Sequence, residues 1–277
     1  MPDQYGKFQR GGQYLVRLLM WIRVCYLECV LSKPEILVAA NLWPPYMEAL
    51  QSAYVVHDRV HQSDPSAFAA LAPRIRAIAA SGEAKVPRAL IDQMPVLEMI
   101  SVFGVGYDGV DVQAARERGV PVTNTPDVLT DDVADMGMGL LLAVARRIAQ
   151  ADRFVRAGEW SHGRMTLGRK VTGARLGVVG LGRIGMAIAR RAEGFGMSVA
   201  YTARHEKPAT AYRYYPTPQA LAAQVDFLMV ITPGGDATRG LIDAQVLAAL
   251  GPQGDLINVA RGSVVDQGAL IRALEQG

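Results

Sequence analysis

The chain has 277 residues, which is enough for one large or two ordinary domains. Half of the residues are hydrophobic and 20% are charged, a composition that argues against disorder and favours a buried core. Lysine and arginine exceed aspartate and glutamate by only 29 to 26, so the net charge of +3 gives no reason to expect nucleic acid as a partner.

Residues 1–32 are expected to form an extension outside the fold. The apolar stretch 13–31 is interrupted by Arg17, Arg23 and Glu28. A membrane span and a signal peptide both need a cleaner apolar run, so we expect neither. An amphipathic surface helix and an upstream extension without function are both open, and we favour the extension.

Cysteine content bears on metal binding and on the compartment. Cys25 and Cys29 are the only cysteines in the chain. A disulfide framework or a zinc site would need more, so we expect no metal site and a cytoplasmic location.

Short apolar runs alternate with helical stretches from Lys33 onward. Strands are expected over 35–39, 75–80, 97–103 and 120–122, and helices over 64–72 and 111–118. Strands that alternate with helices indicate parallel crossovers. We therefore expect an α/β domain over 33–128, closed by the turn-rich hinge at 124–127.

A long amphipathic helix is expected next. Thr130 could cap it, and Asp131 and Asp132 suit the positive end of the helix dipole. Its apolar residues recur at spacings of three and four, which places one stripe on a single face. The stripe consists of Val133, Met136, Leu140, Val144 and Ile148.

A second α/β block follows a polar loop at 158–172. Its strands are expected over 175–179, 197–201, 226–231 and 255–259, and its helices over 183–193, 218–223, 243–250 and 266–275. The sequence thus predicts an α/β fold with two Rossmann-like parallel-sheet domains, the second over 129–277.

The segment Gly180-Leu181-Gly182-Arg183-Ile184-Gly185 is the strongest local signal. It follows a predicted strand and opens a predicted helix, which is the context that a dinucleotide-binding turn requires. Gly180 would permit the tight turn, Gly182 the approach of the pyrophosphate, and Gly185 close packing of helix on strand. The helix N-terminus would face the phosphates. This context favours nucleotide binding over a chance glycine turn.

The end of the next strand distinguishes two cofactors. NAD sites usually place an acid about 20 positions after the first glycine, where it accepts from the ribose 2′-OH. The stretch Ala200-Tyr201-Thr202-Ala203-Arg204-His205 has none. Arg204 could pair with a 2′-phosphate, or it could be an ordinary surface arginine. We expect NADP(H), with NAD(H) as the alternative, bound in part by Thr202 and Arg204.

Three segments together resemble the D-2-hydroxyacid dehydrogenases, in particular the glyoxylate/hydroxypyruvate reductases. They are Phe103-Gly104-Val105-Gly106-Tyr107-Asp108-Gly109-Val110-Asp111, the glycine turn at 180–185, and Ile257-Asn258-Val259-Ala260-Arg261-Gly262-Ser263-Val264-Val265-Asp266. Thr232-Pro233 and 238–242 also match the family's fourth-strand loop. The likeness runs from about Lys33 to Gly277.

This resemblance implies roles for residues outside the glycine turn. The backbone at Val105 and Gly106 would hold the substrate carboxylate. Arg261 would make forked hydrogen bonds to the carboxylate and the C2 oxygen. Residues lining the nicotinamide would be Val105, Thr232, Val259 and Ala260.

The chain departs from the family's pattern at its C-terminal end. The family carries a glutamate and then a histidine downstream of the arginine motif, whereas the last histidine here is His205. Histidine is the usual proton donor in such a reduction at neutral pH. We therefore expect the second domain to be incomplete at Gly277, and the 277-residue chain to bind cofactor without reducing a keto acid.

Two alternatives to a reductase stay open. One is a truncated pseudoenzyme that binds dinucleotide without turnover. The other, from a different class, is a dinucleotide-sensing co-repressor, for which the sequence offers neither a peptide-binding groove nor regulatory tails. For the reductase we expect a small 2-keto or 2-hydroxy acid as the partner, no membrane association, and a homodimer if the chain is complete.

Overall fold

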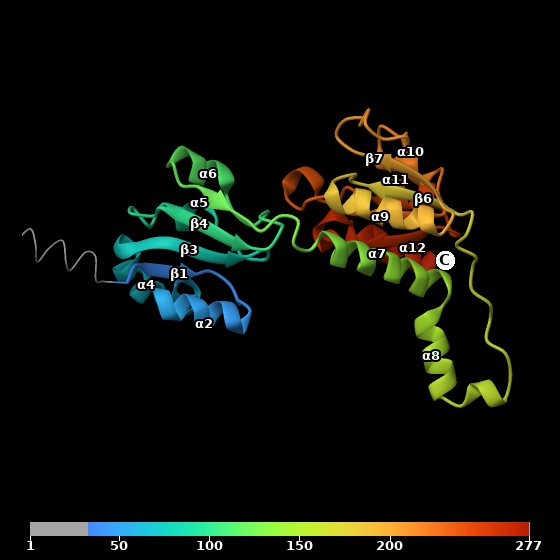
Figure 1. The fold of residues 1–277 in the computed structure, drawn as a ribbon, viewed down its shortest axis with the longest axis horizontal. Helices are drawn as coiled ribbons and strands as arrows, with labels where there is room; N and C mark the ends of the chain where they lie inside the picture. The colour runs from blue at the N-terminus through green and yellow to red at the C-terminus, as the bar shows by residue number, and fades with distance from the viewer. Residues whose placement is uncertain (1–32, 277) are drawn as a thin grey trace, which may run out of the picture. The chain divides into compact units, whose positions relative to one another are not determined.

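The computed structural model describes residues 33–276. The predictions for residues 1–32, the two cysteines included, lie outside the described residues. The described chain forms two compact units, each built on a parallel five-stranded sheet (Figure 1). The predicted fold class of two parallel-sheet α/β domains is confirmed. The first unit comprises the described residues up to Phe103 together with Val110–Thr123, and the second comprises Gly104–Gly109 and the chain from Asn124 onward.

In the first unit the strand order is β2-β1-β3-β4-β5. The strands are β1 Glu35–Val38, β2 Val55–Asp58, β3 Ile75–Ser81, β4 Met99–Phe103 and β5 Val122–Thr123. The helices are α2 Pro44–Ala53, α3 Val60–Ser63, α4 Pro65–Leu71, α5 Arg88–Ile91 and α6 Val112–Glu117. The sequence analysis predicted neither α2 nor β2.

Successive residues of β1 serve opposite faces of the first sheet, as the strand periodicity requires. Ile36 and Val38 pack with Leu50 of α2, whereas Leu37 belongs to a separate core cluster that includes Phe68 of α4. Both faces of the strand are therefore buried, which explains its unbroken apolar sequence.

In the second unit the strand order is β10-β9-β6-β7-β8. The strands are β6 Arg175–Val179, β7 Ser198–Thr202, β8 Arg213–Tyr214, β9 Phe227–Val230 and β10 Asp255–Asn258. The helices are α7 Thr130–Ala145, α8 Ile148–Arg156, α9 Arg183–Gly194, α10 Pro218–Ala222, α11 Ala244–Leu250 and α12 Gln267–Gln276. The first strand in sequence, β6, lies in the middle of the sheet. The strands β7 and β8 are added on one side of it, and β9 and β10 on the other.

The prediction of the long helix is wrong in two respects. The helix ends at Ala145, because Arg147 adopts a left-handed backbone conformation before α8 begins. Thr130 lies inside the helix and its side chain makes no capping bond. The sequence did not tell which face of the helix is buried, and the stripe of larger apolar residues is largely exposed, with Met136 at 60% and Ile148 at 52% of full exposure.

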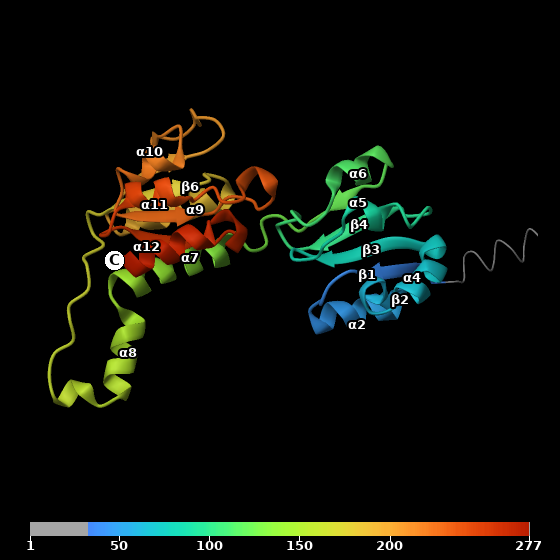
Figure 2. The same ribbon diagram turned by 180° about the vertical axis from the view of Figure 1, so that it is seen from behind.

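A second stripe of smaller residues makes the contact instead. It consists of Ala134, Gly137, Met138, Leu141 and Ala145. These residues let α7 lie close to α9 and β10, and a Cβ built on Gly137 would lie 3.4 Å from Ile188 Cδ1 and from the Met229 side chain. The larger residues are left on the outer face, while α8 and the loop after it extend away from the rest of the unit (Figures 1 and 2).

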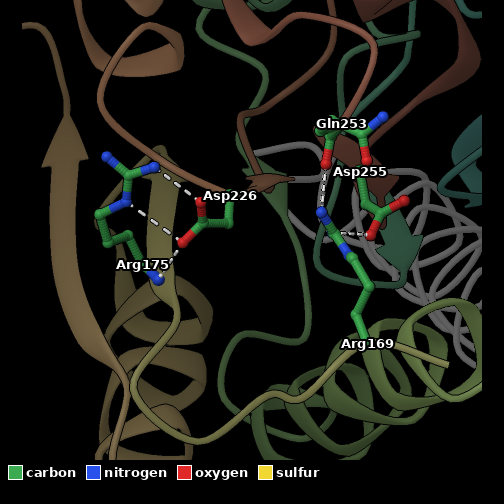
Figure 3. Close-up of polar contacts among 5 residues, drawn as sticks. All are labelled: Arg169, Arg175, Asp226, Gln253 and Asp255. Carbon is green, nitrogen blue, oxygen red and sulfur yellow. Dashed lines mark hydrogen bonds and ion pairs between the residues drawn. The ribbon is translucent and has the colours of Figure 1, made fainter.

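Ion pairs join the strands of the second sheet at their amino ends (Figure 3). The backbone N–H and the guanidinium of Arg175, the first residue of β6, donate to Asp226 just before β9, at 2.7 Å for the two shortest bonds. Arg169 donates to Asp255 of β10 and to the Gln253 carbonyl. The Arg175 guanidinium holds the pKa of the Asp226 carboxyl below its usual value, although partial burial opposes this. The amino ends of the strands are thus occupied by structural contacts, whereas these contacts leave the carboxyl ends free.

Candidate active site in the second unit

The predicted site residues gather at the carboxyl edge of the second sheet. The glycine turn follows β6, Arg204 follows β7, Thr232 follows β9, and Val259 to Arg261 follow β10. These four strands are neighbours in the order β10-β9-β6-β7, so their carboxyl ends lie side by side. In open parallel sheets, ligands bind at this edge where the strand order reverses, which here is between β6 and β9.

Gly180 and Gly185 are required by the packing of the turn. Gly180 has a positive φ of 104°, and a Cβ built on it would lie 2.8 Å from the Ile231 carbonyl oxygen. Its N–H donates to the Thr202 carbonyl at 2.9 Å, which ties the turn to the end of β7. A Cβ on Gly185 would overlap the Gly180 carbonyl oxygen. No larger residue fits either position without moving the backbone.

Gly182 has a different environment. It precedes the first residue of α9, and none of the described side chains caps this helix end. A Cβ built on Gly182 would meet no described heavy atom within 4 Å. The space beside the helix N-terminus is therefore open, and its N–H groups are available to an anion. The turn fits the pyrophosphate of a dinucleotide.

Two further residues of the glycine turn, Arg183 and Ile184, face different surroundings. Arg183 is exposed and pairs with Asp127 at 3.0 Å. Ile184 is half-buried against the core of the unit.

At the end of β7 the chain carries a buried residue and then a basic, exposed segment. Thr202 is buried, whereas Arg204 and His205 are exposed. The segment is held from behind, because the Lys207 N–H donates to the Tyr201 hydroxyl at 2.7 Å. A cationic group thus lies where an NAD site would carry an acid.

Thr232 supplies an unused hydroxyl at the switch point. Among residues 33–276, three buried side-chain atoms lack a hydrogen-bond partner: His61 Nδ1, Asp108 Oδ1 and Thr232 Oγ1. Buried polar atoms are normally satisfied, so an exception needs a reason. At this sheet edge a bound ligand is a fitting partner for the Thr232 hydroxyl.

Arg261 is held by a short turn after β10. The Asn258 side chain accepts from the Ala260 N–H and donates to the Arg261 carbonyl, both at 2.9 Å. The Arg261 side chain is 38% exposed, and its Nη1 donates to the Ala260 carbonyl at 3.0 Å. A guanidinium has five N–H donors, so most of this one stays available for an anion.

The loop Gly104–Gly109 packs against this arginine within the second unit. A Cβ on Gly106 would overlap Arg261 Nη2, so the guanidinium lies directly on the Gly106 backbone. The Val105 carbonyl accepts from the Asn124 side chain at 2.9 Å. The structure thus brings Val105, Gly106 and Arg261 together, although they are far apart in sequence.

Sequence reasoning missed Asp108. It was quoted within a motif and given no role, yet its carboxylate lies 3.2 Å from Arg261 Nη2 and its side chain is only 18% exposed. A charged residue inside a glycine-rich loop was the one signal available. The partner, 153 positions later, could not be read from that loop.

Two further kinds of site, metal centres and membrane spans, concern residues 33–276. No group of three histidine, cysteine, aspartate or glutamate side chains is placed there to hold a metal ion. None of the helices in that range is long and apolar enough to cross a bilayer.

Comparison with known proteins identifies the family. The model of the D-isomer specific 2-hydroxyacid dehydrogenase NAD-binding domain matches residues 138–277. Glyoxylate/hydroxypyruvate reductase A of Arabidopsis thaliana is 48% identical over 203 residues, covering 73% of this chain and 65% of that protein. A 2-ketogluconate reductase of Gluconobacter oxydans is 42% identical over 88% of this chain and 78% of its own length. The match thus spans about two thirds of the Arabidopsis reductase.

Solved structures agree with this assignment. An NADPH-dependent glyoxylate/hydroxypyruvate reductase from Sinorhizobium meliloti, crystallised with NADP and malonate, is 45% identical with a TM-score of 0.82. The similarity covers 88% of this chain and 76% of that one. A 2-hydroxyacid dehydrogenase from Ketogulonicigenium vulgare gives 46% identity and a TM-score of 0.80, over 89% and 78% of the two chains. The chain belongs to the D-isomer specific 2-hydroxyacid dehydrogenase family.

Proposed function

We propose that this protein is of the NADPH-dependent reductase type whose substrates are small 2-keto acids, such as glyoxylate or hydroxypyruvate, and whose products are D-2-hydroxy acids. The described residues would bind the cofactor and the keto acid, while the absence of turnover by the 277-residue chain stays a prediction from the sequence. The observation that carries the proposal is the position of Arg261. Its guanidinium rests on the Gly106 backbone at the same sheet edge as the open glycine turn. A carboxylate site beside a dinucleotide turn is what such a reduction requires.

The residues divide the work between two ligands. When bound, the reduced nicotinamide would supply a hydride to C2 of the keto acid, and the C2 oxygen would take up a proton from solution, since no described residue is assigned as its donor. The N-terminus of α9 binds the pyrophosphate, with Gly182 leaving room for it. Arg261 binds the carboxylate and polarises the C2 oxygen with forked hydrogen bonds, which favours charge on that oxygen as the hydride arrives. Val259, Ala260 and Thr232 line the nicotinamide side.

The preference for NADPH over NADH rests on Arg204. It follows β7 in an exposed, basic segment without the expected acid. A guanidinium makes strong charge-assisted hydrogen bonds to a phosphate dianion. Its interaction with a neutral ribose hydroxyl is weaker. The relative from Sinorhizobium meliloti is described as NADPH-dependent, which supports the same choice.

The substrate site is tested by Arg261→Lys in the full chain loaded with NADPH. The lysine keeps the charge but loses the planar fork, so the affinity for oxamate, a keto-acid analogue, should fall about tenfold. Calorimetry measures both constants, and the NADPH constant should stay unchanged. Arg239→Lys is the matched control, because Arg239 is exposed and pairs only weakly with Asp236. Equal oxamate binding by Arg261→Lys and wild type would place the carboxylate elsewhere.

We also propose that the protein forms a homodimer. The large apolar residues on the outer face of α7, Met136, Leu140 and Val144, are exposed. So are Val155 of α8 and Trp160 and Leu167 of the loop after it. Large apolar side chains exposed on neighbouring elements favour a protein partner. Sedimentation equilibrium at the mass of two chains would support the dimer, and the mass of one chain would contradict it. A cytoplasmic location stays a prediction from the sequence.

A further inference from the structure

The contact between Asp108 and Arg261 needs an explanation, because an acid is unfavourable beside a site for a carboxylate. Asp108 Oδ1 lies 3.2 Å from Arg261 Nη2, is buried, and has no hydrogen-bond partner among the described residues. A negative charge here weakens the field that attracts an anionic substrate. Burying a carboxylate also has a cost. The acid must therefore contribute something other than charge attraction for the substrate.

The packing around the pair restricts both side chains. A Cβ built on Gly234, in the loop after β9, would lie 2.6 Å from Asp108 Oδ2 and 2.9 Å from Arg261 Cγ. On the other side Gly106 lies against Arg261 Nη2. Each of the two charged side chains therefore lies against glycine backbone, Arg261 on both sides and Asp108 at Gly234.

The contacts of Arg261 divide its guanidinium into a held part and a free part. Nη1 donates to the Ala260 carbonyl, and Nη2 faces Asp108. These two contacts fix the orientation of the guanidinium plane, and with it the directions of the remaining N–H groups. An arginine side chain loses considerable rotational freedom when it is fixed, so a fixed guanidinium binds a ligand with a smaller entropic loss.

On this geometry, and resting on the proposed function, we propose that Asp108 is a positioning residue for substrate binding. It holds the Arg261 guanidinium in the orientation that presents its free donors to the substrate carboxylate. The benefit of that orientation exceeds the repulsion between the two carboxylates. Asp108 itself touches neither substrate nor cofactor in this role.

The test is oxamate binding to the full chain loaded with NADPH, measured by calorimetry for wild type, Asp108→Ala and Asp108→Asn. The alanine removes the carboxylate that faces Arg261 Nη2 and should weaken oxamate binding about tenfold. The asparagine keeps a polar oxygen in the same place and should recover part of that loss. NADPH affinity should stay unchanged in both variants. Asp236→Asn is the control, because it removes the same charge at a side chain that is 98% exposed.

A second comparison shows whether Asp108 acts through Arg261. In an Arg261→Lys background, Asp108→Asn should have no further effect on oxamate binding, because the fork that it orients is gone. If Asp108→Ala fails to bind NADPH, and so is unfolded, the asparagine variant and this cycle carry the test. If the role of Asp108 were purely structural, its substitution would weaken the binding of NADPH and of oxamate together.

The outcomes separate this inference from the proposed function. Wild-type binding of NADPH but not of oxamate would overturn the proposed substrate site, and the role of Asp108 with it. Wild-type binding of both, with equal or tighter oxamate binding by Asp108→Asn and Asp108→Ala, would overturn only the positioning role. That result would mean that repulsion dominates and that Asp108 competes with the substrate for Arg261.

Discussion

Gly182 and Gly185 lie three positions apart in one turn, and different physical causes account for them. Gly185 is needed for packing, since a Cβ there would overlap the Gly180 carbonyl oxygen. At Gly182 a Cβ would meet no described heavy atom within 4 Å. Packing therefore does not explain Gly182, and we propose that the approach of a pyrophosphate does.

Gly182→Ala should consequently fold as wild type but bind dinucleotide less well, by about tenfold or more, because the methyl group stands where the pyrophosphate approaches the helix N-terminus. Gly194→Ala in the same helix is the matched control, since a Cβ there also meets open space. Circular dichroism checks the fold and calorimetry the NADPH affinity. Unchanged affinity in Gly182→Ala would remove the pyrophosphate from this turn.

The cofactor preference is a second prediction at the residue scale. Ala203→Asp combined with Arg204→Ala should reverse the preference from NADPH to NADH. Losing one charge-assisted contact costs on the order of 1.5–3 kcal/mol, roughly ten- to a hundredfold in affinity. Titration of each cofactor into both proteins measures the change. Identical curves for the two cofactors with the wild-type chain would contradict a role for Arg204.

At the residue scale, only features that depend on neighbouring residues in the sequence could be predicted. The glycine turn was readable because strand, turn and helix are contiguous, and its geometry depends on neighbours within a few positions. The pairing of Asp108 with Arg261 was not readable, because it depends on how the loop Gly104–Gly109 packs on the turn after β10. The same holds for Asn124, whose side chain donates to the Val105 carbonyl.

At the scale of elements, α7 shows where a periodic pattern is ambiguous. Two stripes with helical spacing share this helix, and only the stripe of larger apolar residues was recognised in the sequence. The structure buries the stripe of Ala134, Gly137 and Leu141, because small residues permit a closer approach to α9. Periodicity alone shows which residues share a face of the helix. How closely that face can approach the neighbouring helix decides whether it is buried.

The amino-end ion pairs of the second sheet make a prediction about pH. The pKa of Asp226 is lowered by Arg175, so its charged form stabilises the folded state above the unfolded pKa. That stability is lost as the pH falls through the lower, folded pKa. Asp226→Asn should therefore destabilise the chain at neutral pH, on the order of 1 kcal/mol, because Arg175 is half-exposed and screened.

Thermal unfolding of wild type and Asp226→Asn across acid pH checks this prediction. The difference between their midpoints should be constant near neutrality and should shrink below about pH 4, close to the ordinary aspartate pKa. Asp236→Asn, whose side chain is 98% exposed, should match wild type throughout. A gap between wild type and Asp226→Asn that persists at the lowest pH would show that the aspartate acts through shape and not through charge.

At the scale of the whole chain, the sequence predicted two parallel sheets and the structure has them. It did not predict that the loop Gly104–Gly109 would belong to the second unit, because such membership depends on tertiary packing and not on strand periodicity. That loop carries Val105, Gly106 and Asp108. Both parts of the proposed site, the dinucleotide turn and the carboxylate clamp, therefore lie on one unit.

Sequential titration of the wild-type chain, first with NADPH and then with oxamate, tests the central claim most directly. We expect saturable binding of one NADPH per chain, tighter than that of NADH, followed by saturable binding of oxamate to the loaded chain. On the proposed function both ligands would bind through residues of the second unit, so both should also raise its unfolding temperature. A chain that shows no saturable NADPH binding, or that binds NADPH but never oxamate, would contradict the account.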